Sequence, residues 1–304
     1  MFKQTVVNVT CLLVCVATLL TACDSGSTDE PITEAGSQSG SIQLPVNTGA
    51  ANEPEAVARW APALDSRWQW QLQGTINTSY NVDVYDIDLF DTPAQTFQLL
   101  QAQGKHVICY FSAGTFENWR TDASLFPTEA IGTPLPDYPS ERWLDVRSEL
   151  VRQVIRHRFD LAKQIGCDAV EPDNIDGYTY DSGFPLTAAD QLDFIRWLGL
   201  SAHEAGLAIG LKNNVELIEQ LVDTFDFAVN EQCFQYDECE AYAPFIDAGK
   251  PVFHVEYSTM PVGDLQRFVG LCLESKRIGM ASLIMPILLD DSFRIDCVDV
   301  LASN

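Results

Sequence analysis

Apolar runs and amphipathic segments alternate along most of this chain. Eight short runs have the length and composition of buried strands; they cover residues 68–72, 82–89, 106–112, 169–173, 208–212, 225–231, 252–257 and 282–288. Segments with helical spacing of apolar positions lie between them, at residues 93–103, 153–165, 187–205, 215–222, 238–248 and 262–277. Strands that alternate with helices predict an α/β fold with a parallel sheet covered by helices.

The number of strand and helix units distinguishes between the possible parallel α/β folds. Eight strand and helix units fit a (β/α)8 TIM barrel. No glycine-rich phosphate loop follows the first strand, which argues against a doubly wound dinucleotide-binding sheet. One long, proline-rich segment, residues 115–140, interrupts the alternation. Loops of this length in compact domains are usually functional, so we expect it to cover the site.

Polar residues follow one predicted strand after another. In a barrel of this kind the carboxyl ends of the strands carry the active site, so these residues predict an enzyme. The candidates are Asp86, Asp88, Tyr110, Ser112, Glu171, Asp173, Lys212, Asn213, Asn214, Asn230, Glu231, Glu256 and Tyr257.

The stretch at residues 169–178, AVEPDNIDGY, is the most acidic of these strand ends. It places Glu171, Asp173 and Asp176 close together. Carboxylates packed this closely repel one another, so their arrangement indicates a functional site. The alternative is a solvated acidic loop at the sheet edge.

The sequence lacks the motifs of several other chemistries. No Cys/His spacing matches a zinc site, no phosphate loop is present, and no serine or cysteine nucleophile motif occurs. Carboxylates remain, and glycoside hydrolysis needs only two of them. We therefore expect no metal and no cofactor. Trp68, Trp70, Tyr110, Trp119 and Tyr257 are candidate platforms for sugar rings, or else parts of the core.

The amino-terminal residues predict export. Residues 1–22 have the pattern of a signal peptide that ends in a lipobox, Leu20-Thr21-Ala22 before Cys23. We expect acylation of Cys23 and a protein that is lipid-anchored to a bacterial membrane on its periplasmic or cell-surface face. A plain secretory signal and an uncleaved anchor are the alternatives. Residues 23–56 read as a flexible tether, and residues 57–304 as the catalytic domain.

The net charge indicates the class of binding partner, and the cysteines indicate possible disulfides. The chain has 18 basic and 43 acidic residues and a formal net charge of −25, which argues against a nucleic-acid partner and favours a cationic one. Export also permits disulfides. Cys233 and Cys239 are placed to close a short loop, and Cys272 and Cys297 to tie a late helix to the C-terminal segment. For Cys109 and Cys167, buried thiols and a bridge are both open.

Six blocks of the sequence together resemble glycoside hydrolase family 114. They are WQWQLQG at residues 68–74, YDIDLFD at 85–91, VICYFSAGTFENWR at 107–120, VEPDNIDGY at 170–178, GLKNN at 210–214 and NEQCFQYDEC at 230–239. The resemblance implies a TIM barrel that acts on an α-1,4-linked galactosamine-rich polymer, because the characterised members of this family are endo-α-1,4-polygalactosaminidases.

The resemblance also implies residue roles. The family's proposed catalytic pair falls on Asp173 and Glu231. The structural alternatives are a helix cap for Asp173 and a partner of Lys212 for Glu231. We expect a monomer that binds a cationic amino-sugar polysaccharide and contacts the membrane only through its lipid. The expected substrate-binding residues are Asp86, Asp88, Tyr110, Glu171, Lys212, Asn213, Tyr257 and Trp70.

Two hypotheses from other classes of protein stay open. One is a sugar-binding surface lipoprotein that has lost turnover, and the other is a scaffold or adhesion protein. Cleavage of an amino-sugar polymer distinguishes the enzyme from both, and binding without cleavage distinguishes the first alternative from the second.

Overall fold

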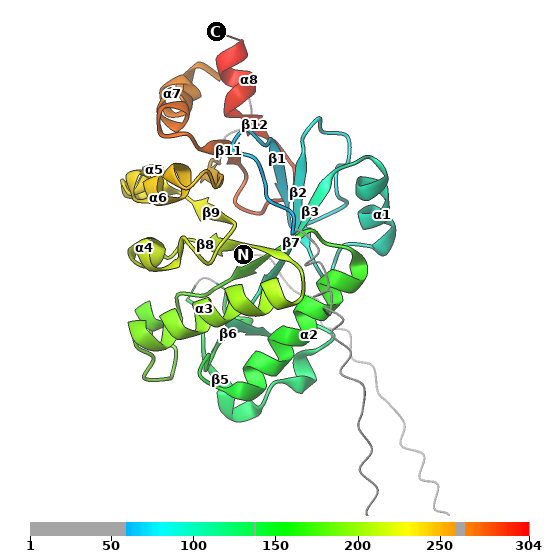
Figure 1. The fold of residues 1–304 in the computed structure, drawn as a ribbon, viewed down its shortest axis with the longest axis vertical. Coiled ribbons are helices and arrows are strands. Elements are labelled where there is room, and N and C mark those ends of the chain that lie inside the picture. Colours follow the sequence, from blue (N-terminus) through cyan, green and yellow to red (C-terminus); the bar gives the residue numbers. More distant parts are fainter. Residues whose placement is uncertain (1–58, 137, 260–264, 304) are drawn as a thin grey trace, which may run out of the picture. The chain divides into compact units, whose positions relative to one another are not determined.

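The computed structural model describes residues 59–303, apart from residue 137 and residues 260–264 (Figure 1). The predicted signal peptide, the lipidation site at Cys23 and the tether lie outside the described residues. Within the described part of the chain, no helix is both long enough and apolar enough to cross a membrane.

A single nine-stranded sheet forms the centre of the fold, in the order β1-β2-β3-β7-β8-β9-β10-β11-β12. The first eight strands in this order are parallel, and β12 pairs with β11 in the antiparallel sense. They are β1 Trp68–Gln71, β2 Val84–Asp88, β3 His106–Ser112, β7 Ala169–Asp173, β8 Ala208–Lys212, β9 Phe227–Glu231, β10 Val252–Tyr257, β11 Ala281–Met285 and β12 Ile295–Asp296. All eight predicted strands are therefore present.

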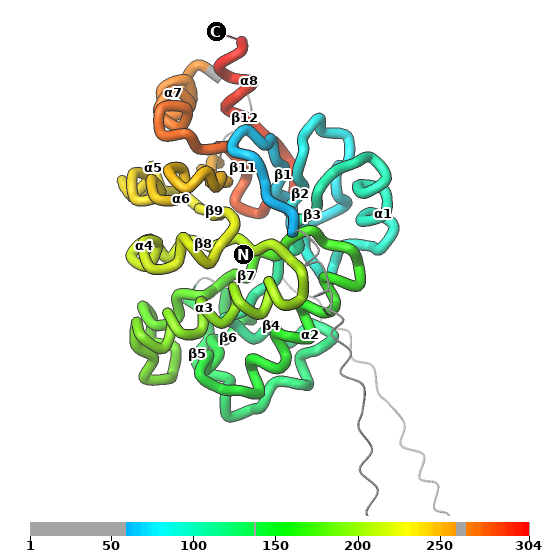
Figure 2. Tube along the Cα trace, viewed as in Figure 1, coloured from blue at the N-terminus to red at the C-terminus, as the bar shows by residue number. Residues whose placement is uncertain are grey.

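The sheet curls into a barrel-like form with helices around its outer side (Figures 1 and 2). In the described residues, no strand pairing joins β1 to β11. Individual hydrogen bonds link the two sides instead. Trp68 Nε1 donates to the carbonyl of Ala281 at 2.9 Å, and the backbone nitrogen of Leu72 donates to the carbonyl of Leu289 at 3.0 Å. The predicted α/β barrel class is confirmed, with this seam between the first and last parallel strands.

The helices follow the predicted order, most of them within shorter limits. They are α1 Ala94–Ala102, α2 Glu149–Ile165, α3 Ala188–Glu204, α4 Ile218–Leu221, α5 Cys233–Tyr236, α6 Ala243–Asp247, α7 Val269–Ile278 and α8 Cys297–Ala302. However, α2 begins four residues before the predicted segment, and α5 and α8 were not predicted. A capping box begins α3, since the backbone nitrogen of Asp190 donates to the Thr187 hydroxyl at 3.2 Å and that of Thr187 to the Asp190 carboxylate at 2.9 Å. α4 and α6 are single turns that continue short 3-10 segments.

Two apolar layers hold the barrel together, because side chains alternate between the faces of each strand. One layer lies between the sheet and the helices and includes Ile87, Val170 and Phe194. The other fills the barrel interior and includes Trp68, which lies 5.0 Å from Phe253 between ring centroids. Trp68 is therefore a core residue, which is the second of the two roles that the sequence left open.

The long segment between β3 and α2 has a sheet of its own. β4 Thr115–Glu117, β5 Ile131–Pro134 and β6 Glu141–Leu144 pair in the antiparallel order β4-β6-β5. A small apolar cluster of Phe126, Ala130 and Leu144 packs this insertion against α2. Its strands are too short for a two-residue period to be detected, which explains why the sequence predicted only a loop.

Three disulfides are present among the described residues. Cys109 pairs with Cys167, Cys233 with Cys239 and Cys272 with Cys297. The last two are the predicted pairs. The first decides the question left open by the sequence, and it ties β3 to the residues just before β7.

Candidate active site

A cleft of about 610 Å³ opens at the carboxyl ends of the parallel strands. It brings together six of the eight predicted binding residues and both predicted catalytic residues. Its lining includes Trp70, Asp88, Tyr110, Asp173, Lys212, Asn213, Glu231 and Tyr257.

The side chain of Lys212, at the end of β8, lies at the floor of this cleft and is 1% exposed. Its Nζ lies 3.0 Å from Glu171 Oε1, 3.1 Å from Asp173 Oδ1 and 3.4 Å from Glu231 Oε2. Burial opposes the charge of Lys212, but the three carboxylates outweigh it and hold its pKa well above the ordinary value. One permanent ammonium thus organises three acids.

Asp173, the last residue of β7, is held by three donors. Its Oδ2 accepts from the Tyr110 hydroxyl at 3.0 Å, and its Oδ1 accepts from the backbone nitrogen of Asn174 at 2.7 Å, in addition to the contact with Lys212. Asn174 has a φ of 57°, a conformation that asparagine tolerates better than most residues. These donors stabilise an ionised carboxylate in a fixed orientation.

Glu231, the last residue of β9, is held from the other side of the cleft. The Tyr257 hydroxyl donates to its Oε1, and Asn213 Nδ2 lies 3.5 Å from its Oε2. Asn213 also accepts from the backbone nitrogen of Glu231 at 3.0 Å, so one side chain fixes both the backbone and the carboxylate. Burial, followed by the charge of Glu231, raises the pKa of Tyr257 well above the ordinary value.

Asp173 and Glu231 therefore share one cation across the cleft. Because Asp173 Oδ1 and Glu231 Oε2 lie 3.1 and 3.4 Å from the same Nζ, these two oxygens are at most about 6.5 Å apart. Neither carboxylate is sealed off, since the side chains are 18% and 27% exposed. Their position matches two carboxyl groups that flank one bond of a substrate.

Asp86 and Glu171 require a correction. Both are 0% exposed and neither belongs to the cleft lining. On a strand, a side chain two residues earlier lies about 6.6 Å deeper on the same face, and this places Glu171 below Asp173 and Asp86 below Asp88. Their burial does not permit direct contact with a substrate, so the predicted binding role is replaced by support of the residues above them.

Asp88 does line the cleft, but its charge is already compensated. Arg120 from the insertion donates to both carboxylate oxygens of Asp88, at 3.0 and 2.7 Å. The same guanidinium also contacts Asp91 at 3.0 Å and Glu117 at 2.9 Å. Asp88 therefore anchors the insertion to β2, and little of its charge is left for a ligand.

Two further acids of the cleft have no cationic partner within 4.0 Å among the described residues. Burial raises the pKa of Glu141 to about 7 and the pKa of Asp176 to about 6. Glu141 Oε2 accepts from the Thr115 hydroxyl at 2.8 Å. The acidic stretch at residues 169–178 gave a signal for Asp176. Glu141 had none, because the unpredicted insertion brings it to the cleft.

The aromatic lining differs from the expectation in part. The Trp70 ring lies beneath Lys212, with Nζ 4.8 Å from the ring centroid, and Trp119 is 48% exposed at the rim. Trp143 and Tyr180 were not predicted; their rings stack at 5.0 Å and both line the cleft. Trp143 belongs to β6, so the insertion supplies both an acid and an aromatic wall.

One group of residues in the described chain has the composition of a metal site. Ligand atoms of Cys233, Cys239 and His254 all lie within 4.8 Å of one another. The two sulfurs are joined in a disulfide and so offer no thiolate, which does not fit a zinc ligand set.

Comparison with known proteins places this geometry in a family. The model of glycoside-hydrolase family GH114 matches residues 49–300. An uncharacterized protein of Deinococcus radiodurans is 26% identical over 281 residues, which cover 82% of this chain and 89% of that protein.

Two solved structures are similar to the chain. Ega3 of Aspergillus fumigatus, solved in complex with galactosamine, is 39% identical with a TM-score of 0.74, and the match covers 81% of this chain and all of that one. The glycoside hydrolase domain of PelA from Pseudomonas aeruginosa has a TM-score of 0.60 at 13% identity, covering 75% of this chain and 97% of that one, and shares the fold.

The family match spans the strands that carry Lys212, Asp173 and Glu231, and it agrees with the resemblance found in the sequence blocks. The chain belongs to glycoside-hydrolase family GH114 and is a glycoside hydrolase.

Proposed function

We propose that this protein cleaves internal bonds of an α-1,4-linked, galactosamine-rich polysaccharide, with Asp173 and Glu231 as its two catalytic carboxylates. The observation that carries the proposal is their position at one cleft, on opposite sides of a single ammonium. The similarity to Ega3, which was solved with galactosamine, supports the choice of sugar.

The spacing favours a double displacement that retains configuration. Retaining glycosidases hold their two carboxyl groups about 5–5.5 Å apart, whereas inverting enzymes need about 6.5–9.5 Å to admit a water between acid and base. The two oxygens that face Lys212 lie within about 6.5 Å of each other, and this limit agrees with the shorter class.

We assign Asp173 as the nucleophile because three donors within 3.1 Å fix its orientation, whereas two of the donors to Glu231 lie at 3.4 and 3.5 Å. Asp173 attacks the anomeric carbon, the bond to the leaving oxygen breaks, and Glu231 gives its proton to that oxygen. Glu231 then takes a proton from water, and the resulting hydroxide attacks the anomeric carbon and releases Asp173. The more exposed position of Glu231 suits a group that exchanges protons with water.

The cleft also suits a cationic sugar. Glu141 and Asp176 have no protein cation within 4.0 Å among the described residues, so an ammonium of the substrate can pair with them. Tyr180 is 48% exposed and offers an aromatic face for a sugar ring, and the buried Trp143 stacks against it. An acid and an aromatic on one wall fit an amino sugar better than a neutral one.

The test is the release of new reducing ends from partly deacetylated galactosaminogalactan. The wild-type protein is expected to release them, and Asp173→Asn and Glu231→Gln to reduce the rate by about 10²- to 10⁴-fold while polymer binding persists. Binding without release by the wild type would indicate the sugar-binding alternative instead. Full activity in either variant would reject the assigned pair.

We further propose that the protein is exported, acylated on Cys23 and active as a monomer. The lipobox sequence supports the anchor. Cys23→Ala in the producing bacterium is expected to move the protein from the membrane fraction to the soluble fraction, and light scattering of the released protein should give one chain per particle. An unchanged membrane fraction would reject acylation of Cys23.

A further inference from the structure

Two carboxyl groups beneath the cleft have no assigned role in the proposed reaction. Asp86 on β2 and Glu171 on β7 are both 0% exposed. Their strands lie on either side of β3, and side chains of alternate strands fill the same interior layer of a barrel. The two carboxyl groups are within hydrogen-bonding reach of each other.

Their oxygens lack donors. Glu171 Oε1 accepts from Lys212 at 3.0 Å, but Glu171 Oε2 and both oxygens of Asp86 have no hydrogen-bond partner among the described residues. Two ionised carboxylates are both acceptors and cannot bond to each other. A proton on either one supplies the missing donor.

The surrounding charges indicate which group holds that proton. Three carboxylates, those of Glu171, Asp173 and Glu231, contact the single ammonium of Lys212, and Asp86 adds a fourth carboxyl group next to Glu171, so the buried cluster is short of positive charge. Lys212 contacts Glu171 directly and favours its ionised form, but burial outweighs this contact and raises the pKa of Glu171 to about 7. No cation lies within 4.0 Å of Asp86 in the described part of the chain, and Trp70 and Ile108 are its register partners on β1 and β3. Burial, followed by the charge of Glu171, raises the pKa of Asp86 well above the ordinary value.

We propose that Asp86 is a positioning residue that stays protonated at neutral pH and donates its O–H to Glu171 Oε2. Glu171 then remains an ionised acceptor for Lys212, and Lys212 stays between Asp173 and Glu231. The link to catalysis rests on the proposed function, whereas the protonation itself does not.

The variant that separates a donor from a charge is Asp86→Asn. Its amide is neutral at every pH and can donate to Glu171, whereas Asp86→Leu has the same branched shape with larger end groups and no donor. At pH 6, Asp86→Asn is expected to keep kcat within threefold of wild type, and Asp86→Leu to lower kcat at least tenfold with little change in KM. Equal loss in both variants would show that Asp86 acts through a negative charge, and would overturn the proposal.

A second measurement needs no substrate. An acid whose pKa is raised by folding contributes stability that is fully present below its unfolded pKa, near 3.8, and is lost as pH rises through the folded value. Each such proton lowers the folding constant by up to about tenfold per pH unit. Between pH 5 and 7, the folding constant measured by urea unfolding should therefore fall up to about 100-fold more in the wild type than in Asp86→Asn.

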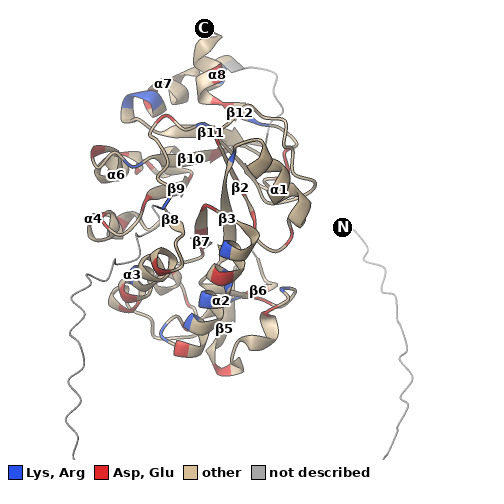
Figure 3. Ribbon diagram, turned by 45° about the vertical axis from the view of Figure 1, so that its right-hand side comes forward, with Lys and Arg blue, Asp and Glu red and all other residues tan. Residues whose placement is uncertain are grey.

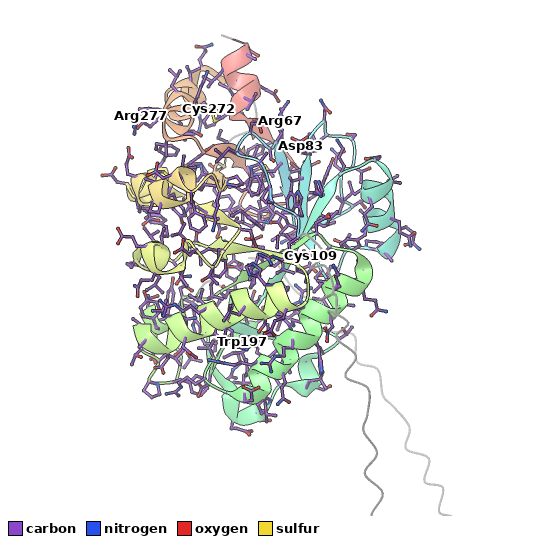
Figure 4. The ribbon with its side chains drawn as sticks, viewed as in Figure 1. Arg67, Asp83, Cys109, Trp197, Cys272 and Arg277 are labelled. Atoms are coloured by element: carbon purple, nitrogen blue, oxygen red, sulfur yellow. A yellow bond between two sulfur atoms is a disulfide. The ribbon has the colours of Figure 1, made fainter. Side chains whose placement is uncertain are left out.

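The matched control is Asp83→Asn, three residues earlier on the same segment. Asp83 is exposed and accepts from the backbone nitrogen of Arg67 at 2.9 Å, and both residues are labelled in Figure 4. This variant should follow the wild-type dependence on pH. Parallel curves for wild type and Asp86→Asn would overturn the proposal even if the polymer is cleaved. A wild type that cleaves no polymer but differs from Asp86→Asn in this way would reject the proposed function and support the protonation.

Discussion

At the scale of single residues, Lys212 determines how the acids are arranged. The sequence placed Asp173, Glu231 and Lys212 at strand ends, and the structure brings a carboxylate oxygen of each acid within 3.4 Å of Lys212 Nζ. The sequence did not separate the residues that face the cleft from those one layer below. The two-residue alternation of a strand contains that information, because Glu171 precedes Asp173 on the same face. The depth at which the cleft ends depends on packing around the whole barrel and cannot be read from one strand.

Lys212→Met tests this central role. Removal of the ammonium leaves three carboxylates facing one another in a buried site, and loss of one partner of a buried pair costs about 3–5 kcal/mol of unfolding free energy. Urea unfolding and reducing-end release should both decline. Lys163→Met is the control: its Nζ donates to the carbonyl of Gly206 at 3.2 Å at the surface, and we expect a change within about 0.5 kcal/mol. Similar losses in both variants would contradict the role of Lys212.

At the scale of elements, the parallel strands were predictable and the insertion was not. The strands of the barrel alternate regularly with helical segments along the chain, whereas β4, β5 and β6 are short and contain glycine, threonine, proline and charged residues. The insertion was expected to cover the site, and it lines one wall of the cleft through Glu141 and Trp143. Its contribution depends on pairing between strands that are distant in sequence, which one segment alone does not reveal.

Glu141 should make polymer capture sensitive to pH. Its pKa of about 7 means that the carboxylate forms as pH rises from 5.5 to 7.5. One unit charge near an ammonium contributes about 1 kcal/mol in water, or about fivefold in affinity. Glu141→Gln should therefore show a smaller rise than wild type, with the remainder due to Asp176. Glu149→Gln, in the exposed first turn of α2, should behave as wild type. An equal rise of affinity with pH in Glu141→Gln would show that Glu141 does not bind the polymer.

The disulfide between Cys109 and Cys167 should contribute more to the free energy of unfolding than the disulfide between Cys233 and Cys239. The two bridges close loops with separations of 58 and 6 residues. The chain-entropy relation gives about 4 and about 2 kcal/mol for such loops. Paired alanine variants of each bridge, compared by urea unfolding, should show this order. Equal losses, or the reverse order, would show that packing at the bridges outweighs the entropy of the unfolded chain.

At the scale of the whole molecule, charge and composition favour a cationic partner. Acidic residues occur on many elements around the barrel, with few basic ones among them (Figure 3). A formal net charge of −25 attracts a polycation over distances comparable to the Debye length. Composition alone did not name a sugar; that step required the sequence blocks of the family and the geometry of the cleft.

Salt should weaken capture of the deacetylated polymer much more than capture of the fully N-acetylated polymer. The Debye length falls from about 8 Å at 0.15 M to about 3 Å at 1 M ionic strength, and only the deacetylated polymer carries ammonium groups. Apparent affinities of both polymers at the two salt concentrations provide the comparison. Equal salt sensitivity would show that the net charge serves solubility alone.

The stereochemistry of cleavage tests the central claim most directly, because it depends on both carboxylates and on the distance between them. Proton NMR can follow the anomer that first appears when the wild-type protein is mixed with partly deacetylated α-1,4-linked galactosamine polymer. The α-anomer should appear first and then equilibrate with the β-anomer, and neither Asp173→Asn nor Glu231→Gln should produce it at a comparable rate. Initial release of the β-anomer, or no release from a polymer that the protein binds, would contradict a retaining hydrolase built on Asp173 and Glu231.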